Sequence, residues 1–182
     1  MRKTNLSKYD NSWYKPGKKF VCVLWYFVNV IFFKSHINPS SGFKILLLQM
    51  FGAKVGRGLV IKPGVSVKYP WKLEIGNYCW IGEDVWIDNL AKVTIEDNVC
   101  ISQGAILLCG NHNYKKITFD LVVGAIALKE GVWVGAKATV CSGVTLNSHA
   151  ILSVGSVANK DLDAYAIYQG NPAIKIRERK IK

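Results

Sequence analysis

Acidic residues are scarce in this sequence. Its 182 residues include 12 Asp and Glu against 24 Lys and Arg, which gives a formal net charge of +12. A chain this basic is expected to meet an anionic partner, such as a nucleic acid, a membrane surface or a phosphate-bearing small molecule. Nucleic-acid binding fits the charge, but the sequence contains no recognition module for DNA or RNA, so we expect no nucleic-acid partner.

The sequence also has few residues suited to disulfides or metals. The five cysteines form an odd set without a C-x-x-C pair, which argues against a disulfide framework and a zinc cage and favours a reducing compartment. The three histidines, His36, His112 and His149, lie 76 and 37 residues apart. A zinc-dependent hydratase of the gamma carbonic anhydrase type needs three histidines around its metal. The spacing disfavours that class, and we expect no metal.

Long hydrophobic runs are missing too. The longest, residues 20–33, has 14 residues, whereas a helix needs roughly 20 to span a bilayer. Residues 1–19 before it are polar and basic and are expected to be loose, and no cleavable signal is visible. After a break, residues 43–51 are expected to form a second short helix with Ser40 or Ser41 as its N-cap.

The apolar run has two interpretations. The first is a helix packed on the body of the protein or on a neighbouring subunit. The second is a helix lying on a membrane surface with the help of flanking lysines. Together with the reducing compartment that the cysteines favour, we predict a cytoplasmic protein. Under the second interpretation it also makes peripheral contact with the inner membrane. The flanking lysines are Lys15, Lys18, Lys19 and Lys34.

The most abundant feature is a six-residue repeat that runs from Val55 to about Ala158. Strands repeat every two residues and helices every 3.6, so a sustained period of six indicates a repeat architecture. Three hexads close a triangular coil of about eighteen residues, and stacked coils pair at about 4.8 Å. The recurring aliphatic residues include Ile75, Ile81, Ile87, Ile95, Ile101, Leu107, Leu128, Val134, Val140, Leu146 and Leu152.

Three steps break this period. Residues 67–75 and 87–95 are steps of eight, which predict a bulge of about two residues at a corner of each coil. Residues 107–128 form a step of 21. Against a coil of about eighteen, we expect about three residues to be extruded, near residues 111–120. Extruded loops in repeat proteins often carry function, because the scaffold gains nothing from them.

Several segments resemble a known family. Residues 132–136 (VWVGA) resemble the C-terminal half of the maltose, galactoside and nodulation acetyltransferases. Residues 51–56 (FGAKVG) and 170–179 (GNPAIKIRER) are closer still to acetyltransferases of the colanic-acid biosynthesis type, which act in exopolysaccharide pathways. The resemblance covers nearly the whole chain from about Gly42 onward. It implies an all-β core, namely a left-handed parallel β-helix, with an N-terminal helical extension and a C-terminal tail.

The resemblance also suggests how the chain is divided. Residues 1–54 are expected to form a polar arm and helical segments. Residues 55–160 are expected to form the β-helix acyltransferase domain, with the extruded loop near residues 109–125. Residues 161–182 are expected to form a C-terminal tail that contacts the coenzyme.

The reaction implied by the resemblance is transfer of an acetyl group from acetyl-CoA to a sugar hydroxyl. A hydroxyl is a poor nucleophile at neutral pH, so a base must take its proton as it attacks the thioester. Imidazole suits this role because it titrates near neutrality. In the family a loop histidine acts as the base, and His112 stands at the matching place. We expect His36 and His149 to be structural or exposed.

Acceptor and coenzyme contacts are implied by the same resemblance. Asp84 and Asn89 are expected at the edge that carries the loop, and correspond approximately to the family's acceptor-binding Asn and Asp with the side-chain types exchanged. Asn111 is predicted to orient the acceptor or the histidine. A backbone N–H near Ala136 is expected to polarise the thioester carbonyl. The predicted coenzyme contacts are Trp133, Gly135, Ala136, Val154, Gly155, Lys160, Arg177 and Arg179, and the last three supply charge for phosphates.

In the family the coenzyme lies between two subunits, which implies a closed threefold homotrimer. Each predicted contact has a plainer alternative, a polar corner or a solvated charge. Two other functions stay open at this point. One is N-acetylation of an amino sugar or xenobiotic, for which a histidine base would also serve. The other is a non-catalytic β-helix scaffold, which leaves the His112 loop unexplained.

Overall fold

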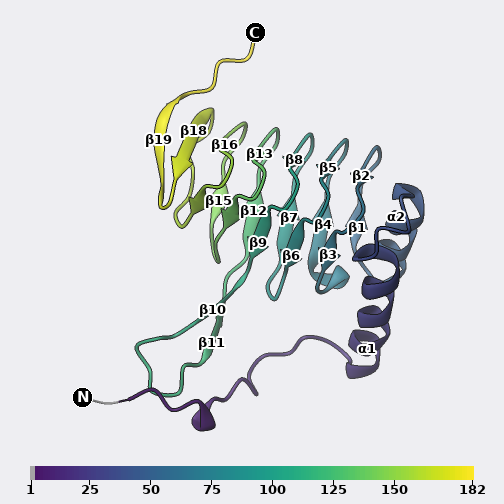
Figure 1. The fold of residues 1–182 in the computed structure, drawn as a ribbon, viewed down its shortest axis with the longest axis vertical. Helices are drawn as coiled ribbons and strands as arrows, with labels where there is room; N and C mark the ends of the chain where they lie inside the picture. The colour runs from purple at the N-terminus through teal and green to yellow at the C-terminus, as the bar shows by residue number, and fades with distance from the viewer. Residues whose placement is uncertain (1–2) are drawn as a thin grey trace.

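The computed structural model describes residues 3–182, and its body is a three-sided parallel β-helix (Figure 1). The chain turns from one side to the next, so each strand pairs with strands of neighbouring coils. Side 1 comprises β1 (Lys54–Val55), β4 (Leu73–Ile75), β7 (Val93–Ile95), β12 (Ile126–Leu128) and β15 (Thr145–Leu146). Side 2 comprises β2 (Val60–Ile61), β5 (Trp80–Ile81), β8 (Cys100–Ile101), β13 (Trp133–Val134) and β16 (Ile151–Leu152). Side 3 comprises β3 (Ser66–Val67), β6 (Trp86–Asp88), β9 (Ile106–Leu108), β14 (Thr139–Val140) and β17 (Val157–Ala158).

The interior is filled by the aliphatic residues of the six-residue repeat. On side 1, Ile75, Ile95 and Leu128 stack in register from coil to coil, and all three are buried. Small corner residues such as Val65 and Ala105 are fully buried and fill the remaining space. Each layer packs on the layers before and after it, so the coils stabilise one another as a stack. The period of six is therefore confirmed as a β-helix.

Corner 3, where side 3 leads into side 1 of the next coil, contains the irregular steps. In the first coil it holds a 3-10 turn, η3 (Pro70–Lys72), which confirms the expected bulge. After the third coil the chain leaves at Cys109, forms an antiparallel hairpin that projects from the body, and returns at Gly124 (Figure 1). The hairpin consists of β10 (Gly110–His112) and β11 (Leu121–Val123). The prediction of about three extruded residues was wrong, because the long step replaces one six-residue side of the triangle rather than a whole coil.

The expected N-terminal helices are confirmed, with Ser40 as the N-cap of the second: its side chain accepts a hydrogen bond from the N–H of Phe43. Within residues 3–182, none of the helices combines the length and the apolar character needed to cross a membrane. The helical elements before the first strand are η1 (Leu6–Lys8), α1 (Lys19–Val28), its π-helical continuation η2 (Asn29–Phe33), and α2 (Ser41–Met50).

These helices cover the open edge of the first coil. The indole Nε1 of Trp25 donates to the carbonyl of Val67 at 2.8 Å, and the Asn29 side chain accepts from the N–H of Val67 at 3.2 Å. The Lys44 side chain, which is fully buried, donates to the carbonyl of Lys62 at 3.0 Å. An uncovered strand edge invites pairing with other chains, so the helices protect the edge and satisfy its free backbone groups.

The C-terminal tail contains a two-stranded hairpin, which the sequence did not predict. Strand β18 (Ala166–Gly170) joins side 2 parallel to β16, and β19 (Ala173–Glu178) folds back antiparallel on β18. The six-residue repeat decays after Leu152, so periodicity gave no signal for these two strands.

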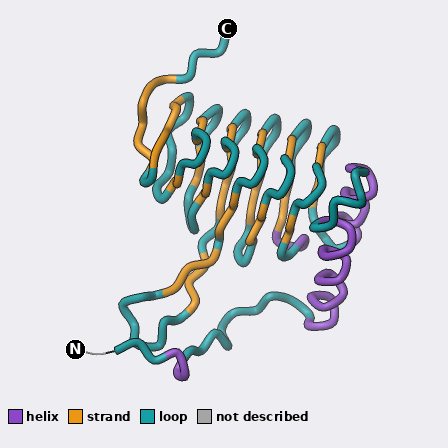
Figure 2. Tube along the Cα trace, viewed as in Figure 1, coloured by secondary structure: helices purple, strands orange, loops and turns teal. Residues whose placement is uncertain are grey.

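The N-terminal arm, residues 3–18, runs past the projecting hairpin and is mostly loop (Figure 2). The backbone N–H of Asn5 donates to the carbonyl of Ile117 in the hairpin at 2.8 Å. At the other end of the arm, the indole of Trp71 donates to the carbonyl of Pro16 at 2.7 Å. The expectation of a loose segment was wrong here, because hydrogen bonds to the hairpin and to corner 3 hold the arm in place.

Candidate functional site

The imidazole of His112 is held by the other arm of its own hairpin. Its Nδ1 lies 3.0 Å from the carbonyl oxygen of Phe119, and the two rings stack with centroids 4.4 Å apart and planes 9° apart. A carbonyl oxygen can only accept, so Nδ1 carries the proton of the neutral ring. The lone pair of Nε2 is thereby left free to take a proton, which is the state that a general base needs.

Two further residues lie around this ring. The side-chain oxygen of Asn111 accepts a hydrogen bond from the backbone N–H of His112 at 2.8 Å, which restrains the backbone that carries the imidazole. Tyr9 of the N-terminal arm places its ring 5.9 Å from the imidazole, centroid to centroid. The arm therefore brings an aromatic surface to the candidate base from the N-terminal end of the chain.

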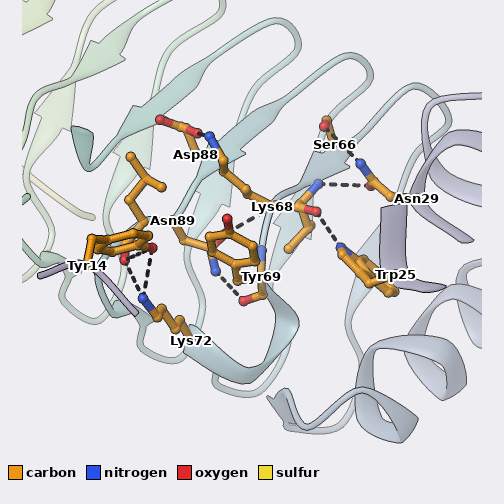
Figure 3. Close-up of polar contacts among 11 residues, drawn as sticks. Tyr14, Trp25, Asn29, Ser66, Lys68, Tyr69, Lys72, Asp88 and Asn89 are labelled. Carbon is orange, nitrogen blue, oxygen red and sulfur yellow. Dashed lines mark hydrogen bonds and ion pairs between the residues drawn. The ribbon is translucent and has the colours of Figure 1, made fainter. Parts of the chain in front are cut away.

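An ion pair between an exposed lysine and a buried aspartate lies at the base of the hairpin (Figure 3). The Lys68 ammonium lies 2.9 Å from one carboxylate oxygen of Asp88, whose side chain is almost fully buried. Gly110 packs closely over this point: an added Cβ would lie 2.6 Å from Leu90 Cδ1 and 3.5 Å from the other oxygen of Asp88. The carboxylate of Asp88, with Lys68 as its counter-ion, thus lies beneath the strand that carries His112.

Lys72 and Tyr14 fasten the N-terminal arm to the same corner (Figure 3). Lys72 Nζ donates to the carbonyl of Leu90 at 2.7 Å and to the Tyr14 hydroxyl at 2.9 Å, and that hydroxyl donates to the same carbonyl at 2.7 Å. Burial raises the pKa of Tyr14 and lowers the pKa of Lys72. Tyr14 therefore remains a hydrogen-bond donor at neutral pH.

Other reactive side chains are poorly placed for catalysis beside His112. Burial raises the pKa of the Cys109 thiol to about 11, so it is not a nucleophile at neutral pH. His36 is exposed near corner 2, between sides 2 and 3, with its Nε2 3.3 Å from Asp84. His149 lies at corner 1, between sides 1 and 2, and stacks on Tyr165 with centroids 4.7 Å apart. The three histidines of one chain thus lie at different corners.

Of the predicted acceptor contacts, only Asn111 lies next to His112. Asn89 is at corner 3 but fully buried; its amide accepts from the N–H groups of Lys68 and Tyr69 and donates to the Tyr69 carbonyl (Figure 3). Its observed role is to hold that corner together. Asp84 lies at corner 2, so the expectation that it shares an edge with the loop was wrong: it directly follows a side 2 strand, whereas the loop follows a side 3 strand.

Most of the predicted coenzyme contacts gather along side 2 and corner 2. The backbone N–H of Gly155 donates to the carbonyl of Ala136 at 2.9 Å, so the two turns stack. A Cβ at Gly135 would lie 2.6 Å from the backbone nitrogen of Val154, so only glycine fits there. The Trp133 indole is 45% exposed on side 2 and donates to Ser102. The predicted contacts in this group are Trp133, Gly135, Ala136, Val154 and Gly155.

The three cationic residues of the predicted coenzyme set are more dispersed. Lys160 is exposed where the last coil leaves side 3, and Arg177 is exposed on β19. Arg179 donates to the carbonyls of Gly131 and His149 at 2.8 and 3.1 Å, which places it at corner 1. Within one chain Arg179 is hydrogen-bonded to corner 1 of the β-helix and does not lie at corner 2.

The His112 hairpin and the corner 2 turns lie at different edges of the prism. Side 3 separates the two corners, so one chain cannot bring His112 and the Ala136 backbone to the same bond. A site that uses both groups must therefore combine corner 3 of one chain with corner 2 of another.

Sequence reasoning missed three residues near His112. Phe119 shares the loop between β10 and β11 with Tyr114, and nothing in the sequence distinguishes it. Asp88 is a charged residue directly after an inward-facing isoleucine, which marks it as unusual. Tyr9 gave no signal, because its contact with His112 depends on how the N-terminal arm folds back.

Comparison with known proteins gives the family. No protein-family model matches the chain. The sequence is 34% identical over 166 residues to the colanic acid biosynthesis acetyltransferase WcaF of Escherichia coli strain K12, and the match covers 91% of each chain. The protein belongs to the hexapeptide-repeat acetyltransferases. It is also 28% identical over 154 residues to galactoside O-acetyltransferase of the same strain, which covers 79% of this chain and 73% of that one.

Solved structures agree with this assignment. A galactoside acetyltransferase in complex with coenzyme A is 25% identical with a TM-score of 0.74, and the match covers 88% of this chain and 80% of that one. The hexapeptide-repeat acetyltransferase VCA0836 of Vibrio cholerae, complexed with acetyl coenzyme A, has a TM-score of 0.80 at 18% identity and covers 90% and 89% of the two chains. The fold is therefore confirmed as the left-handed β-helix of this family.

Proposed function

We propose that the protein transfers the acetyl group of acetyl-CoA to a sugar hydroxyl in the biosynthesis of an exopolysaccharide or another surface polysaccharide. The observation that carries the proposal is the contact of His112 Nδ1 with the Phe119 carbonyl, which leaves Nε2 free as a base. The names of the relatives, a colanic acid acetyltransferase and a galactoside O-acetyltransferase, support a sugar acceptor.

The chemistry follows from the free Nε2. As the acceptor oxygen attacks the thioester carbonyl, its proton passes to Nε2 of His112. The tetrahedral intermediate collapses, the carbon–sulfur bond breaks, and the thiolate of coenzyme A takes the proton back from the imidazolium. The backbone N–H of Ala136 stabilises the oxyanion, as a fixed donor in an acyl-transfer site does. Asn111 keeps the backbone of His112 in place.

In this proposal the coenzyme binds at corner 2 of one subunit, against the His112 hairpin of the next. Trp133 and the backbone of Gly135 and Gly155 line the pantetheine arm. Lys160 and Arg177 supply charge for the phosphates, while Arg179 holds corner 1 together. Two structures of the same fold contain coenzyme A or acetyl coenzyme A, which supports a coenzyme site in this scaffold.

A closed homotrimer is the assembly that fits these surfaces. The outward residues of side 2 and side 3 include Trp80, Trp133 and Trp86, which are 59%, 45% and 44% exposed. Side 1 instead carries charge outward, with Lys54 paired to Glu74 at 2.8 Å. Two apolar sides and one charged side suit threefold closure, in which two different faces meet and the third faces solvent.

The direct test is turnover with a panel of acceptors. The protein is incubated with acetyl-CoA and matched pairs of hydroxyl and amino sugars, and release of the free thiol is measured. The proposal predicts release with a hydroxyl sugar and transfer of the acetyl group to oxygen. Acetylation of amino sugars alone would favour an N-acetyltransferase. No release with any acceptor, despite coenzyme binding, would favour a non-catalytic scaffold.

A further inference from the structure

The excess of positive over negative charge lies in the N-terminal part of the chain. Residues 1–73 contain thirteen Lys and Arg and a single acidic residue, Asp10. Residues 74–182 contain eleven Lys and Arg and eleven Asp and Glu. The formal net charge of +12 therefore belongs to the segment that forms the arm, the helices and the first coil, while the rest of the β-helix is neutral.

Helix α1 and its continuation η2 are apolar on nearly every face, with Lys19 at the start and Asn29 as the exceptions. Trp25, Asn29 and Phe33 lie on the inward face and are buried against the first coil. A helix that is apolar all round is normally buried all round. Here no other part of residues 3–182 covers the outward face of α1 and η2. Its exposed apolar residues are Phe20, Val23, Leu24, Tyr26, Phe27, Val30 and Ile31.

The apolar surface continues from α1 onto the end of α2. Phe20 at the start of α1 is 78% exposed, and Met50 at the end of α2 is 69% exposed. A hollow of about 640 Å³ lies between the two helices. Its lining is mainly apolar and includes Lys18, Val21, Leu24, Met50, Phe51 and Trp71.

Exposed lysines lie at both ends of the α1–η2 helix that carries this apolar surface. Lys18 and Lys19 stand at the start of α1, and Lys34 directly follows η2. Helices that lie in the interface of a bilayer have this arrangement of apolar and cationic side chains. Their apolar side chains enter the acyl region, and their lysine ammonium groups contact anionic headgroups.

We propose that the outward face of α1 and η2, with the end of α2, docks the enzyme on an anionic lipid bilayer. A second copy of this end of the chain fits less well, because it would bring two strongly positive surfaces together. A nucleic acid would match the charge, but it gives no role to the exposed rings and aliphatic side chains. The proposal depends on this surface alone and is independent of the acceptor assignment.

The test is co-sedimentation of the full chain with vesicles of phosphatidylcholine alone and of phosphatidylcholine mixed with phosphatidylglycerol. We expect binding to the anionic vesicles and little to the neutral ones, with a decline as salt rises. The double variant Lys18→Gln/Lys19→Gln should weaken binding about thirtyfold. The double variant Phe20→Ser/Phe27→Ser should weaken it by about tenfold or more. Lys180→Gln/Lys182→Gln, which removes the same charge from the far end, is the matched control and should bind like wild type.

Each variant is first checked for an unchanged melting temperature, and single substitutions replace any double variant that fails. Absence of vesicle binding by the wild type would overturn the proposal. Equal losses in the Lys18/Lys19 and Lys180/Lys182 variants would also overturn it, because the binding would then follow total charge. A smaller oligomer in the Phe20/Phe27 variant with unchanged vesicle binding would assign the face to a second copy. Tighter binding to a DNA or RNA oligonucleotide, lost in the same variants, would assign it to nucleic acid.

Discussion

His112 and Phe119 face each other across the hairpin that interrupts the β-helix, with the imidazole Nδ1 3.0 Å from the Phe119 carbonyl and the rings stacked at 4.4 Å. The carbonyl selects the tautomer and the ring fixes the orientation. The hairpin thus provides both the candidate base and the group that prepares it.

Removing the Phe119 ring should loosen the base without removing its backbone partner. In Phe119→Ala the carbonyl stays but the stacking surface is lost, so the imidazole samples more orientations. We expect kcat to fall about tenfold, with little change in the KM for acetyl-CoA. Steady-state kinetics would measure both constants. Tyr114→Ala, at a 74% exposed position of the same hairpin, is the control and should leave kcat unchanged. An equal fall in both variants would show that any change in the hairpin is enough.

Lys44 offers a test of how the first coil is closed. Its buried ammonium donates to the Lys62 carbonyl at 3.0 Å, and burial lowers its pKa. Lys44→Met keeps the aliphatic length but leaves the carbonyl unpaired, so we expect the protein to lose about 1–3 kcal/mol of unfolding free energy. Urea denaturation measures this. Lys54→Met, which removes an exposed lysine, is the control and should change the unfolding free energy far less. Similar losses in both variants would show that the hydrogen bond from Lys44 to the first coil does not stabilise the protein.

The outward tryptophans test the proposed assembly. Trp86 is 44% exposed on side 3, whereas Thr94 lies between the two buried residues of β7 and so occupies an outward position on side 1. A carboxylate at position 86 would have to be buried in a trimer interface, so Trp86→Glu should dissociate the trimer. Thr94→Glu should leave it intact. Light scattering coupled to size-exclusion chromatography distinguishes the two outcomes, and a Trp86→Glu protein that keeps the wild-type mass would exclude side 3 from the interface.

The repeat was predictable because its physics is local. Each coil needs an inward aliphatic residue every six positions, so residues such as Ile75, Ile95 and Leu128 indicate the fold through their spacing alone. The hairpin was predictable in place but not in size. The C-terminal strands were missed because they follow no period of six.

The candidate site was less accessible from sequence, because it depends on contacts between distant segments. His112 was found through its family position. Its tautomer depends on the Phe119 carbonyl and its surroundings depend on Tyr9, and neither contact leaves a pattern in the sequence. Asn89 shows a second difficulty. It is a polar residue at corner 3, the corner of the hairpin, but its side chain is buried and hydrogen-bonded to backbone groups, so it does not face an acceptor.

The most direct measurement compares acetyl transfer and coenzyme binding in His112→Ala. Calorimetry gives the Kd for acetyl-CoA, and single-turnover kinetics with an accepted sugar gives the rate of the chemical step. If Nε2 of His112 is the base, the rate should fall by roughly two or more orders of magnitude while the Kd stays unchanged. A variant that transfers acetyl at the wild-type rate would contradict the role of His112 as the base. The β-helix fold and the family assignment would be unaffected.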